Sequence, residues 1–568
     1  MNSIDHIQKA FSDHIKTLFP PSTSLHPSHK ASEHTAGRTV EITSDLCKLH
    51  INVDEAKQAF GNLSTSIALA LAKQLKRVPR EVATEIATTF THPLIEKIEI
   101  AGPGFINIYF KPETFKLLAH ELYEQKEAFF KPDKLEKKYN VSLEFVSANP
   151  TGPLHFGHGR GGIIGDVLGN VLRFVGHIVT KEFYINDAGN QIQKLGESFK
   201  VRCLQVAGMD ATIPEDGYHG EYLTELAQDC YAQYGQKLFE EPNSFFADYA
   251  KNNLLEALKS TLKDYGIEYD VWFSEKTLHQ GNAIPQALDI LQQHGLLFEQ
   301  EGALWFRTTQ FGDDKDRVVR KSTGEYTYIA ADIAYLKNKI DRGFNNLMMV
   351  LGHDHHSYVT RLNAVKDGLG YNTIPLSVIL YQLVKISEDG ALVRMSKRAG
   401  AIVGLQDIIN TVGKDVARFF YLNRKADAQL EFDVALALKK TEENPVYYIQ
   451  YAYVRTGSIL AKAAEQADLH DINAQDAHYI GKEEAFLIKK IVFLEQLLMD
   501  ISTNHQTHLL TYYALELAQL FHRYYSHVRV IDGENKEKSR GRLLMIGLLR
   551  NTIALVLDIL GISHPEKM

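Results

Sequence analysis

Two histidines, His155 and His158, have the clearest chemical potential in this chain. They lie in "HFGHGRGG", after the β-rich "SLEFVSA" and at the start of a helical pattern from Gly157. A helix N-terminus presents unpaired N–H groups to an anion, and imidazole N–H groups can donate to phosphoryl oxygens as charge develops there. Gly157 and Gly159 permit close approach of the backbone to a flat ring or a phosphate. The corner therefore predicts phosphate chemistry, although the four-residue pattern alone leaves a purely structural role open.

A second histidine-rich segment, "VLGHDHHSYVTR", raises the question of a metal site. It contains His353, Asp354, His355 and His356 in succession. Adjacent residues at a strand end point to alternate faces, and a zinc site needs three or four ligands of suitable spacing. Neither this segment nor the first histidine pair supplies such a set, so we predict no protein-bound metal.

The elements that must position these residues alternate between strand and helix from residue 141 to about 430. That order predicts a doubly wound parallel sheet, in which ligands bind at the carboxyl ends of the strands. Long helical patterns between about 190 and 300 indicate an insertion. We therefore expect an α/β domain over residues 114–430.

A further domain is expected on each side of the α/β domain. Residues 1–113 predict a small α+β domain, with helices at 1–19 and 64–77, a short strand at 39–43, and two strands flanking Gly102-Pro103-Gly104. Residues 431–568 have almost entirely helical patterns and no convincing strand. They predict an all-α domain, so the expected order is α+β, then α/β, then all-α.

Composition restricts the class of protein. A chain of 568 residues is expected to form roughly two to four domains. Its 45% hydrophobic and 23% charged residues are typical of a soluble globular protein. The three cysteines are scattered without a C-x-x-C pair, which argues against a zinc ribbon and a disulfide framework. That usage suits a reducing cytosol, so we expect a cytoplasmic location, and we expect a monomer.

Neither the N-terminus nor the most apolar stretch predicts a membrane segment. The first residues lack a basic region followed by an apolar one. The stretch at 543–562 is interrupted by Arg550, Asn551 and Asp558, and its leucines recur at near-helical spacing. It therefore predicts a packed helix. The net charge of −8 by itself predicts no nucleic-acid partner, but a local basic face would be enough for phosphates.

With its surroundings, the histidine pair resembles a known family. "HFGH" resembles the HIGH signature of class I aminoacyl-tRNA synthetases, and "VRMSKRAG" at 393–400 resembles their KMSKS signature. Around them, "LEFVSANPTGPLHFGHGRG", "FYINDAGNQI", "EYTYIAADIAY", "NPVYYIQYAYVR", "FHRYYSHVRV" and "GISHPEKM" resemble arginyl-tRNA synthetases. Arg394 replaces the first signature lysine and Arg398 the last serine, whereas Lys397 keeps the second lysine. The resemblance implies a Rossmann-type catalytic domain, an N-terminal α+β domain that contacts the tRNA elbow, and a C-terminal helical bundle that binds the anticodon.

The resemblance also implies the site residues. For catalysis these are His155, His158 and Lys397, and for ATP with Mg²⁺ they are His155, Gly157, His158, Gly352, Met395, Ser396 and Lys397. For arginine they are Glu144, Ser147, Asn149, Tyr328, Asp332 and His355, with His356 left open as the alternative to His355. A guanidinium carries five N–H donors, so a selective pocket needs carboxylates in a fork arrangement. Glu144 and Asp332 are the two carboxylates in this group. The spacing of four places Tyr328 and Asp332 on one face if that segment is helical.

The all-α domain carries aromatic and basic side chains together, as unstacked RNA bases require. The candidates for tRNA contact are Tyr448, Arg455, Arg523 and Arg529. Tyrosines at helical spacing are more often core residues, so the pattern by itself favours core packing for Tyr448 and Tyr451.

The reaction implied has two steps. Arginine and ATP form arginyl-adenylate and pyrophosphate, and the arginyl group then passes to the 2′-hydroxyl of the terminal ribose of tRNA-Arg. Two alternatives from other classes remain: a nucleotidylyltransferase for a small molecule, and a catalytically silent paralogue that binds RNA. The presence of His155, His158 and Lys397 argues against the silent paralogue, and the helical domain of about 140 residues argues against the small-molecule enzyme.

Overall fold

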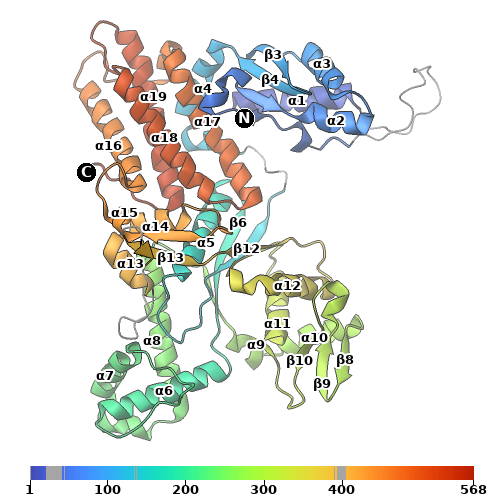
Figure 1. The fold of residues 1–568 in the computed structure, drawn as a ribbon, viewed down its shortest axis with the longest axis vertical. Coiled ribbons are helices and arrows are strands. Elements are labelled where there is room, and N and C mark those ends of the chain that lie inside the picture. The colour runs from blue at the N-terminus through green and yellow to red at the C-terminus, as the bar shows by residue number, and fades with distance from the viewer. Residues whose placement is uncertain are drawn as a thin grey trace, which may run out of the picture.

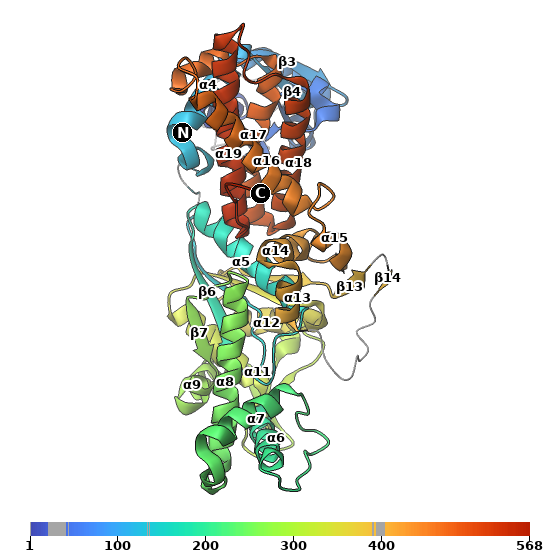
Figure 2. The ribbon, with the colours of Figure 1, turned by 90° about the vertical axis from the view of Figure 1, so that its left-hand side faces the viewer.

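The computed structural model describes residues 2–568 except 21–40, Ser44, Asp133, Lys134, Glu136, 389–390 and 393–403. The N-terminal domain lies beside the C-terminal helical bundle at one end of the molecule, and two lobes extend from the central sheet at the other end (Figures 1 and 2). The three-domain fold predicted from the sequence is confirmed in its type and order.

The N-terminal domain packs helices against a four-stranded antiparallel sheet of order β1-β2-β4-β3. In its first helix Ile7, Phe11 and Ile15 recur every four residues and are fully buried, which explains why this segment folds as an amphipathic helix. Its elements are α1 (Ser3–Leu18), β1 (His50–Ile51), β2 (Leu63–Thr65), α2 (Ile67–Leu75), α3 (Pro79–Thr89), β3 (Ile95–Ala101) and β4 (Phe105–Phe110); α4 (Pro112–Gln125) follows them and packs against the C-terminal bundle. The predicted pair of strands around Gly102-Pro103-Gly104 is confirmed.

The strand predicted at 39–43 is wrong for the part that the structure describes. Residues 41–43 have no regular secondary structure. The backbone N–H of Glu41 donates to the Gln74 side chain (3.0 Å) rather than to a neighbouring strand. The described part of this segment therefore has no neighbouring strand to pair with, in spite of its β-propensity, and the first strand begins at His50.

The central domain is built on a five-stranded parallel sheet of order β12-β11-β5-β6-β7. Its strands are β5 (Asn140–Phe145), β6 (Ile178–Ile185), β7 (Val271–Ser274), β11 (Asn346–Gly352) and β12 (Leu376–Tyr381), and the helices α5 (His158–Phe174), α11 (Tyr328–Asp341) and α12 (His356–Gly368) pack beside it. From β5 the chain moves outward to β6 and β7 and then returns to β11 on the other side of β5. Adjacent connections diverge there, so the crevice at the carboxyl ends of β5 and β11 is the expected ligand site.

The insertion expected at about 190–300 consists of two lobes separated by a strand. The first is helical, with α6 (Asn190–Val206), α7 (Tyr222–Tyr234) and α8 (Asn243–Asp264); the second contains α9 (Lys276–Gln280), α10 (Ala283–Gln293) and the sheet of β8 (Leu297–Gln300), β9 (Ala303–Phe306) and β10 (Arg317–Arg320). Figure 1 shows both lobes below the sheet. Between the two lobes, the short edge strand β7 pairs with β6 of the central sheet. A segment of four residues is too short for its periodicity to predict this pairing.

The C-terminal helices begin after a short strand that the helical pattern did not predict. The expectation of no strand after residue 430 is wrong, because β15 (Leu430–Asp433) pairs in parallel with β13 (Val384–Glu388), which also pairs with β14 (Ala391–Leu392). Between them lie α13 (Leu405–Val412) and α14 (Lys414–Leu422), followed by α15 (Val434–Leu438), α16 (Pro445–Ala464), α17 (Lys482–Asn504), α18 (His508–His527) and α19 (Lys536–Leu560). Helices therefore dominate, but the bundle is joined to the catalytic domain through a small sheet.

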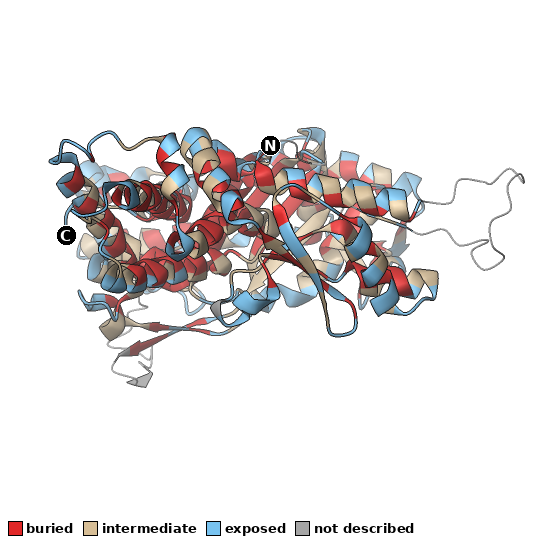
Figure 3. Cartoon of the chain, turned by 90° about the horizontal axis from the view of Figure 1, so that it is seen from above, coloured by how far each residue is buried: buried red, intermediate tan, exposed pale blue. Residues whose placement is uncertain are grey.

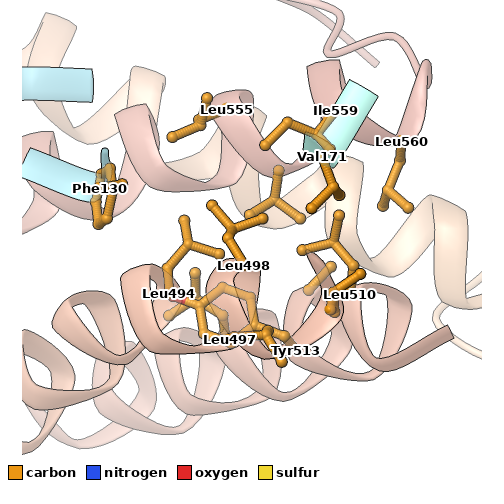
Figure 4. Close-up of a cluster of buried hydrophobic side chains, with 14 of the residues drawn as sticks. Phe130, Val171, Leu494, Leu497, Leu498, Leu510, Tyr513, Leu555, Ile559 and Leu560 are labelled. Carbon is orange, nitrogen blue, oxygen red and sulfur yellow. The ribbon is translucent and has the colours of Figure 1, made fainter. Parts of the chain in front are cut away.

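Helix α19 is the packed helix predicted from the apolar C-terminal stretch. By length and composition it could span a membrane, but 72% of its most apolar window is buried inside the protein. Leu555, Ile559 and Leu560 lie with leucines of α17 and α18, and Val171 of α5 joins the same cluster (Figure 4). Each of α17, α18 and α19 has a run of buried residues, and across the whole chain buried residues lie on the inward faces of the helices and exposed residues on the outward faces (Figure 3). The bundle and the catalytic domain thus share one hydrophobic core.

A buried ion network crosses the same boundary. Arg418 of α14 is fully buried and pairs with Asp166 of α5 (2.6 Å). Its guanidinium also donates to the backbone carbonyls of Tyr265, after α8, and Leu560, at the end of α19 (2.8 and 2.7 Å). Lys181 of β6 binds the other oxygen of Asp166 (2.6 Å). Removing one partner of such a network leaves an unpaired buried charge, so α5, α14 and the end of α19 are held in fixed relation.

Candidate active site

The strand-to-helix corner holds its two histidines in defined tautomers. Helix α5 begins at His158, with Gly157 as its N-cap residue. The backbone N–H of His155 donates to Nδ1 of His158 (3.0 Å), and that of Gly157 donates to Nδ1 of His155 (3.1 Å). Burial lowers the pKa of both imidazoles, so both are neutral at pH 7. Since Nδ1 accepts in each ring, Nε2 carries the proton and is the donor available to a ligand.

The two glycines of this corner have different roles. A Cβ on Gly159 would lie 2.6 Å from the Leu405 side chain and 2.8 Å from Tyr421, so this glycine allows α5 to pack against α13 and α14. This packing is enough to explain a glycine at 159, and its predicted approach to a ligand stays a prediction. At Gly157 the atoms that an added Cβ would meet belong to His155, the nearest at 3.1 Å, and its assignment to a nucleotide site stays a prediction.

A cavity of about 360 Å³ opens at the carboxyl ends of β5 and β11. It is the crevice that the strand order predicts, and its wall comes from the end of β5, one face of α11 and the start of α12. The lining includes all six residues that the sequence analysis grouped for the amino acid: Glu144, Ser147, Asn149, Tyr328, Asp332 and His355. Residues spread over more than two hundred positions of the chain thus meet at one cavity.

The second histidine-rich segment is not part of a strand. Strand β11 ends at Gly352, which is half-buried, and His353–His355 form one 3₁₀ turn before α12 begins at His356. The alternation of faces assumed for these residues is therefore wrong. His355 lines the cavity, whereas His356 is absent from its lining residues. Among the residues that the structure describes, no group of three or more histidines, cysteines, aspartates and glutamates is placed to hold a metal ion.

Acidic side chains give the cavity its electrostatic character. The pKa of Asp332 is raised to about 7, mainly by burial and also by the nearby carboxylates Glu275 and Glu144, while a hydrogen bond from Tyr358 and the charge of Arg361 oppose the rise. Glu144 is buried, accepts from Ser147 Oγ at Oε1 (3.0 Å) and binds Lys339 Nζ at Oε2 (2.5 Å). A cation entering the cavity would relieve the repulsion between these carboxylates.

Several residues of this site escaped the sequence analysis. Tyr184, Lys339, Tyr358 and Arg361 line the cavity, and Glu275 acts on Asp332 from the end of β7. Lys339 had a readable signal, since it follows Asp332 by seven residues, two turns along the same face of α11. Glu275 had none, because its proximity depends on a strand that the sequence did not reveal.

The candidate nucleic-acid residues gather in two hollows on the bundle. Tyr448 and Tyr451 of α16 pack on His522 of α18, with ring centroids 4.5 and 5.6 Å away, and line a hollow of about 460 Å³. Arg455 and Arg529 line another, of about 810 Å³. Tyr451 is 41% exposed, so its expected core position is wrong. The core face of α16 is formed instead by Ile449, Ala452, Tyr453 and Thr456.

Two groups of candidates remain to be placed. Arg523 is exposed on α18, and its charge lowers the pKa of Tyr448 against the larger effect of burial. Tyr448 itself is half-buried. Met395, Ser396 and Lys397 lie outside the described residues, so their assignment stays a prediction.

Comparison with known proteins places each part of the chain. Residues 5–110 match the model described as arginyl tRNA synthetase N terminal domain, residues 120–426 the model for tRNA synthetases class I (R), catalytic domain, and residues 449–568 the DALR anticodon binding domain. The arginine–tRNA ligase of Oceanobacillus iheyensis is 41% identical over 90% of this chain and 93% of its own length. That of Bacillus subtilis is 41% identical over 89% and 92%. The fold is similar to that of Thermus thermophilus arginyl-tRNA synthetase, with a TM-score of 0.72 at 20% identity, over 99% of this chain and 100% of the other.

Proposed function

The chain belongs to the arginyl-tRNA synthetase family, and from that premise we propose how its residues carry out the activity. It activates L-arginine with ATP and transfers the arginyl group to tRNA-Arg. The observation that carries the proposal is the acidic cavity at the carboxyl ends of β5 and β11, since the histidine corner follows the same strand β5 in the chain. The test is pyrophosphate exchange with each proteinogenic amino acid, with and without tRNA. Arginine should be the only amino acid that supports exchange. A chain that binds tRNA without any exchange would be a silent paralogue instead.

Arginine binds in the cavity with its guanidinium against Asp332 and Glu144. A planar fork of N–H donors matches carboxylate oxygens better than a point charge does. Tyr328, exposed at the first position of α11, covers the aliphatic part of the substrate, one helical turn before Asp332. Ser147, Asn149 and His355 hold the α-amino and carboxylate groups, near the end of β5 where ATP must meet them.

The chemical step needs positioning and charge stabilisation more than covalent chemistry. The arginine carboxylate attacks the α-phosphorus of ATP, the bond to the bridging oxygen breaks, and pyrophosphate leaves as arginyl-adenylate forms. The Nε2–H groups of His155 and His158, together with the start of α5, stabilise the charge that develops on the phosphoryl oxygens. Gly157 and Gly352 lie against the nucleotide, and Met395, Ser396 and Lys397 act on its phosphates. Mg²⁺ accompanies ATP on the phosphate oxygens, as it does in sites where the substrate supplies most of its ligands.

The two outer domains bind the tRNA. Tyr448, Arg455, Arg523 and Arg529 receive the anticodon loop, because stacking faces and cations there suit unpaired bases. The N-terminal domain, residues 1–113, contacts the tRNA elbow, and the catalytic and anticodon domains extend over 114–430 and 431–568. The chain acts as a cytoplasmic monomer, and three buried free cysteines support the cytoplasmic part of the proposal. Light scattering of the purified protein would test the monomer.

The affinity for arginine should depend on pH through Asp332. Its pKa of about 7 means that lowering the pH below 7 protonates the carboxylate that a guanidinium must meet. The KM for arginine should therefore rise as the pH falls, by about tenfold per unit below pH 7, and should level off above it. The groups facing Asp332 are Glu144, Glu275, Tyr358 and Arg361. The measurement is KM for arginine between pH 5.5 and 8.5.

The matched control for this pH dependence is Asp332→Asn. This variant should bind arginine weakly at every pH, with a KM that no longer follows the titration. A wild-type KM that is constant from pH 6 to 8 would contradict the assignment of Asp332.

Arginine activation should also depend on tRNA, as the family resemblance implies. The ion network around Arg418 offers a route, because it connects the end of α19 in the anticodon bundle to α14 and to α5 behind the histidine corner. A tRNA can shift the active arrangement only by its differential affinity for the two states. A coupling of about 1–3 kcal/mol would give roughly 5–150-fold stimulation. The measurement is pyrophosphate exchange with arginine and ATP alone, and then with intact tRNA.

A tRNA without its anticodon arm is the control for that experiment. Full exchange in the absence of any tRNA would rule the dependence out. Equal stimulation by intact and truncated tRNA would instead place the trigger at the acceptor end.

A further inference from the structure

Lys339 is a buried cation inside a cavity that must accept a cation. It lies on α11, its side chain is 3% exposed, and it lines the cavity at the end of β5. Its ammonium lies 2.5 Å from Glu144 Oε2 and 4.4 Å from the centroid of the Tyr335 ring. A buried lysine is uncommon unless it is paired. Because Lys339 is paired with Glu144, a carboxylate that we propose to bind the substrate, its position needs a functional explanation.

The neighbouring charges indicate which carboxylate Lys339 neutralises. Glu182, fully buried and 3.8 Å from Lys339, already binds Arg342 through both of its oxygens (2.6 and 3.0 Å) and accepts from the Tyr335 hydroxyl (2.5 Å). The ammonium of Lys339 is therefore balanced mainly by Glu144. One oxygen of Glu144, a residue that lines the cavity, is occupied by Lys339; the other, Oε1, accepts from Ser147 and keeps a second lone pair.

We propose that Lys339 determines specificity, by occupying the Glu144 oxygen that a substrate ammonium would need and so excluding lysine and ornithine while admitting arginine. A guanidinium spreads its charge over a plane and is weakly hydrated, so it can bridge Asp332 and the remaining oxygen of Glu144. An ammonium is a compact, strongly hydrated charge and would have to share one carboxylate with the ammonium of Lys339. The repulsion between the Lys339 ammonium and the substrate ammonium would therefore weaken the binding of lysine and ornithine. The inference rests on the proposed binding of arginine in this cavity.

The test is the ratio of kcat/KM for lysine to kcat/KM for arginine, measured by pyrophosphate exchange in the presence of tRNA. Lys339→Met removes the ammonium and leaves Glu144 free to pair with a substrate, so the ratio should rise at least tenfold. Lys339→Gln, which keeps a hydrogen-bond donor to Glu144, should raise it in the same direction and serves if the Met variant does not fold. Lys339→Arg retains a cation and should keep the wild-type ratio.

The double variant Lys339→Met with Glu144→Gln separates specificity from structural support. It removes both charges, so the cavity offers a substrate ammonium no unpaired Glu144 carboxylate, and the ratio should return toward that of the wild type. If Lys339→Met and Lys339→Gln lower both activities with an unchanged ratio, Lys339 is only a structural residue and the inference is overturned.

Asp332→Asn distinguishes failure of this inference from failure of the proposed function. If arginine binds in this cavity, that variant raises KM for arginine at least tenfold. An unchanged KM means that arginine binds elsewhere, and the proposed function of the cavity fails together with the inference. A raised KM in Asp332→Asn with an unchanged ratio in the Lys339 variants overturns the inference alone.

Discussion

Citrulline should be activated less efficiently than arginine by roughly 10⁴-fold or more in kcat/KM. It has nearly the shape of arginine but carries no charge, so it would leave the carboxylate of Asp332 buried near Glu144 and Glu275 without the substrate's cation. A site built to pair with a substrate's polar groups rejects an analogue that lacks them because its own groups are left unsatisfied. The measurement is pyrophosphate exchange with each amino acid as the sole substrate, in the presence of tRNA.

Asp332→Asn is the matched control for the citrulline comparison. Its amide offers neither charge nor a second acceptor to a guanidinium, so arginine should lose far more than citrulline and the ratio between them should shrink. Activation of citrulline by the wild type within tenfold of arginine would mean that the carboxylates of this cavity do not recognise the guanidinium.

Lys397→Ala should lower kcat for arginine activation by about 10²–10³-fold, as removal of other preorganised donors does. The family resemblance assigns this lysine to the β- and γ-phosphates and to the departing pyrophosphate, where charge increases in the transition state. An interaction made mainly in the transition state changes kcat and leaves the substrate KM nearly constant. The measurement is the steady-state rate of exchange over a range of arginine concentrations.

Arg394→Ala is the control for Lys397→Ala, since it removes a neighbouring cation from the same segment. Its effect should be milder, because that position already departs from the signature lysine and a guanidinium does not reproduce ammonium geometry. A raised KM for arginine with unchanged kcat in Lys397→Ala would make the lysine a substrate-binding residue. Equal losses in the two variants would point to a general basic patch.

The elements recovered from the sequence are those whose signal is local. The apolar spacing of α1, the strands around Gly102 and Gly104, and the helix that begins at His158 each follow from residues within a few positions of one another. The grouping of Glu144 with Asp332 was available in the same way, because the resemblance marks short motifs. The side chains that mark each motif lie within a few positions of one another, so the motif can be identified without knowing what it packs against.

The misses occurred where a segment's state depends on distant partners. Strand β7 and strand β15 are four residues long, and each is a strand because an existing strand pairs with it. Tyr451 is exposed because other residues of α16 face the core. Periodicity cannot select between such outcomes, since short apolar segments fit several environments.

By itself the sequence determined the family, the order of domains and the motif residues of the cavity. Only the tertiary structure decided that Lys339 neutralises Glu144, that Glu275 raises the pKa of Asp332, and that His355 rather than His356 lines the cavity. The physical reason is that pairing and pKa depend on distances of a few ångströms between side chains that lie far apart in the chain. Those distances are set by the register of parallel strands and by the packing of α11 and α12 beside them.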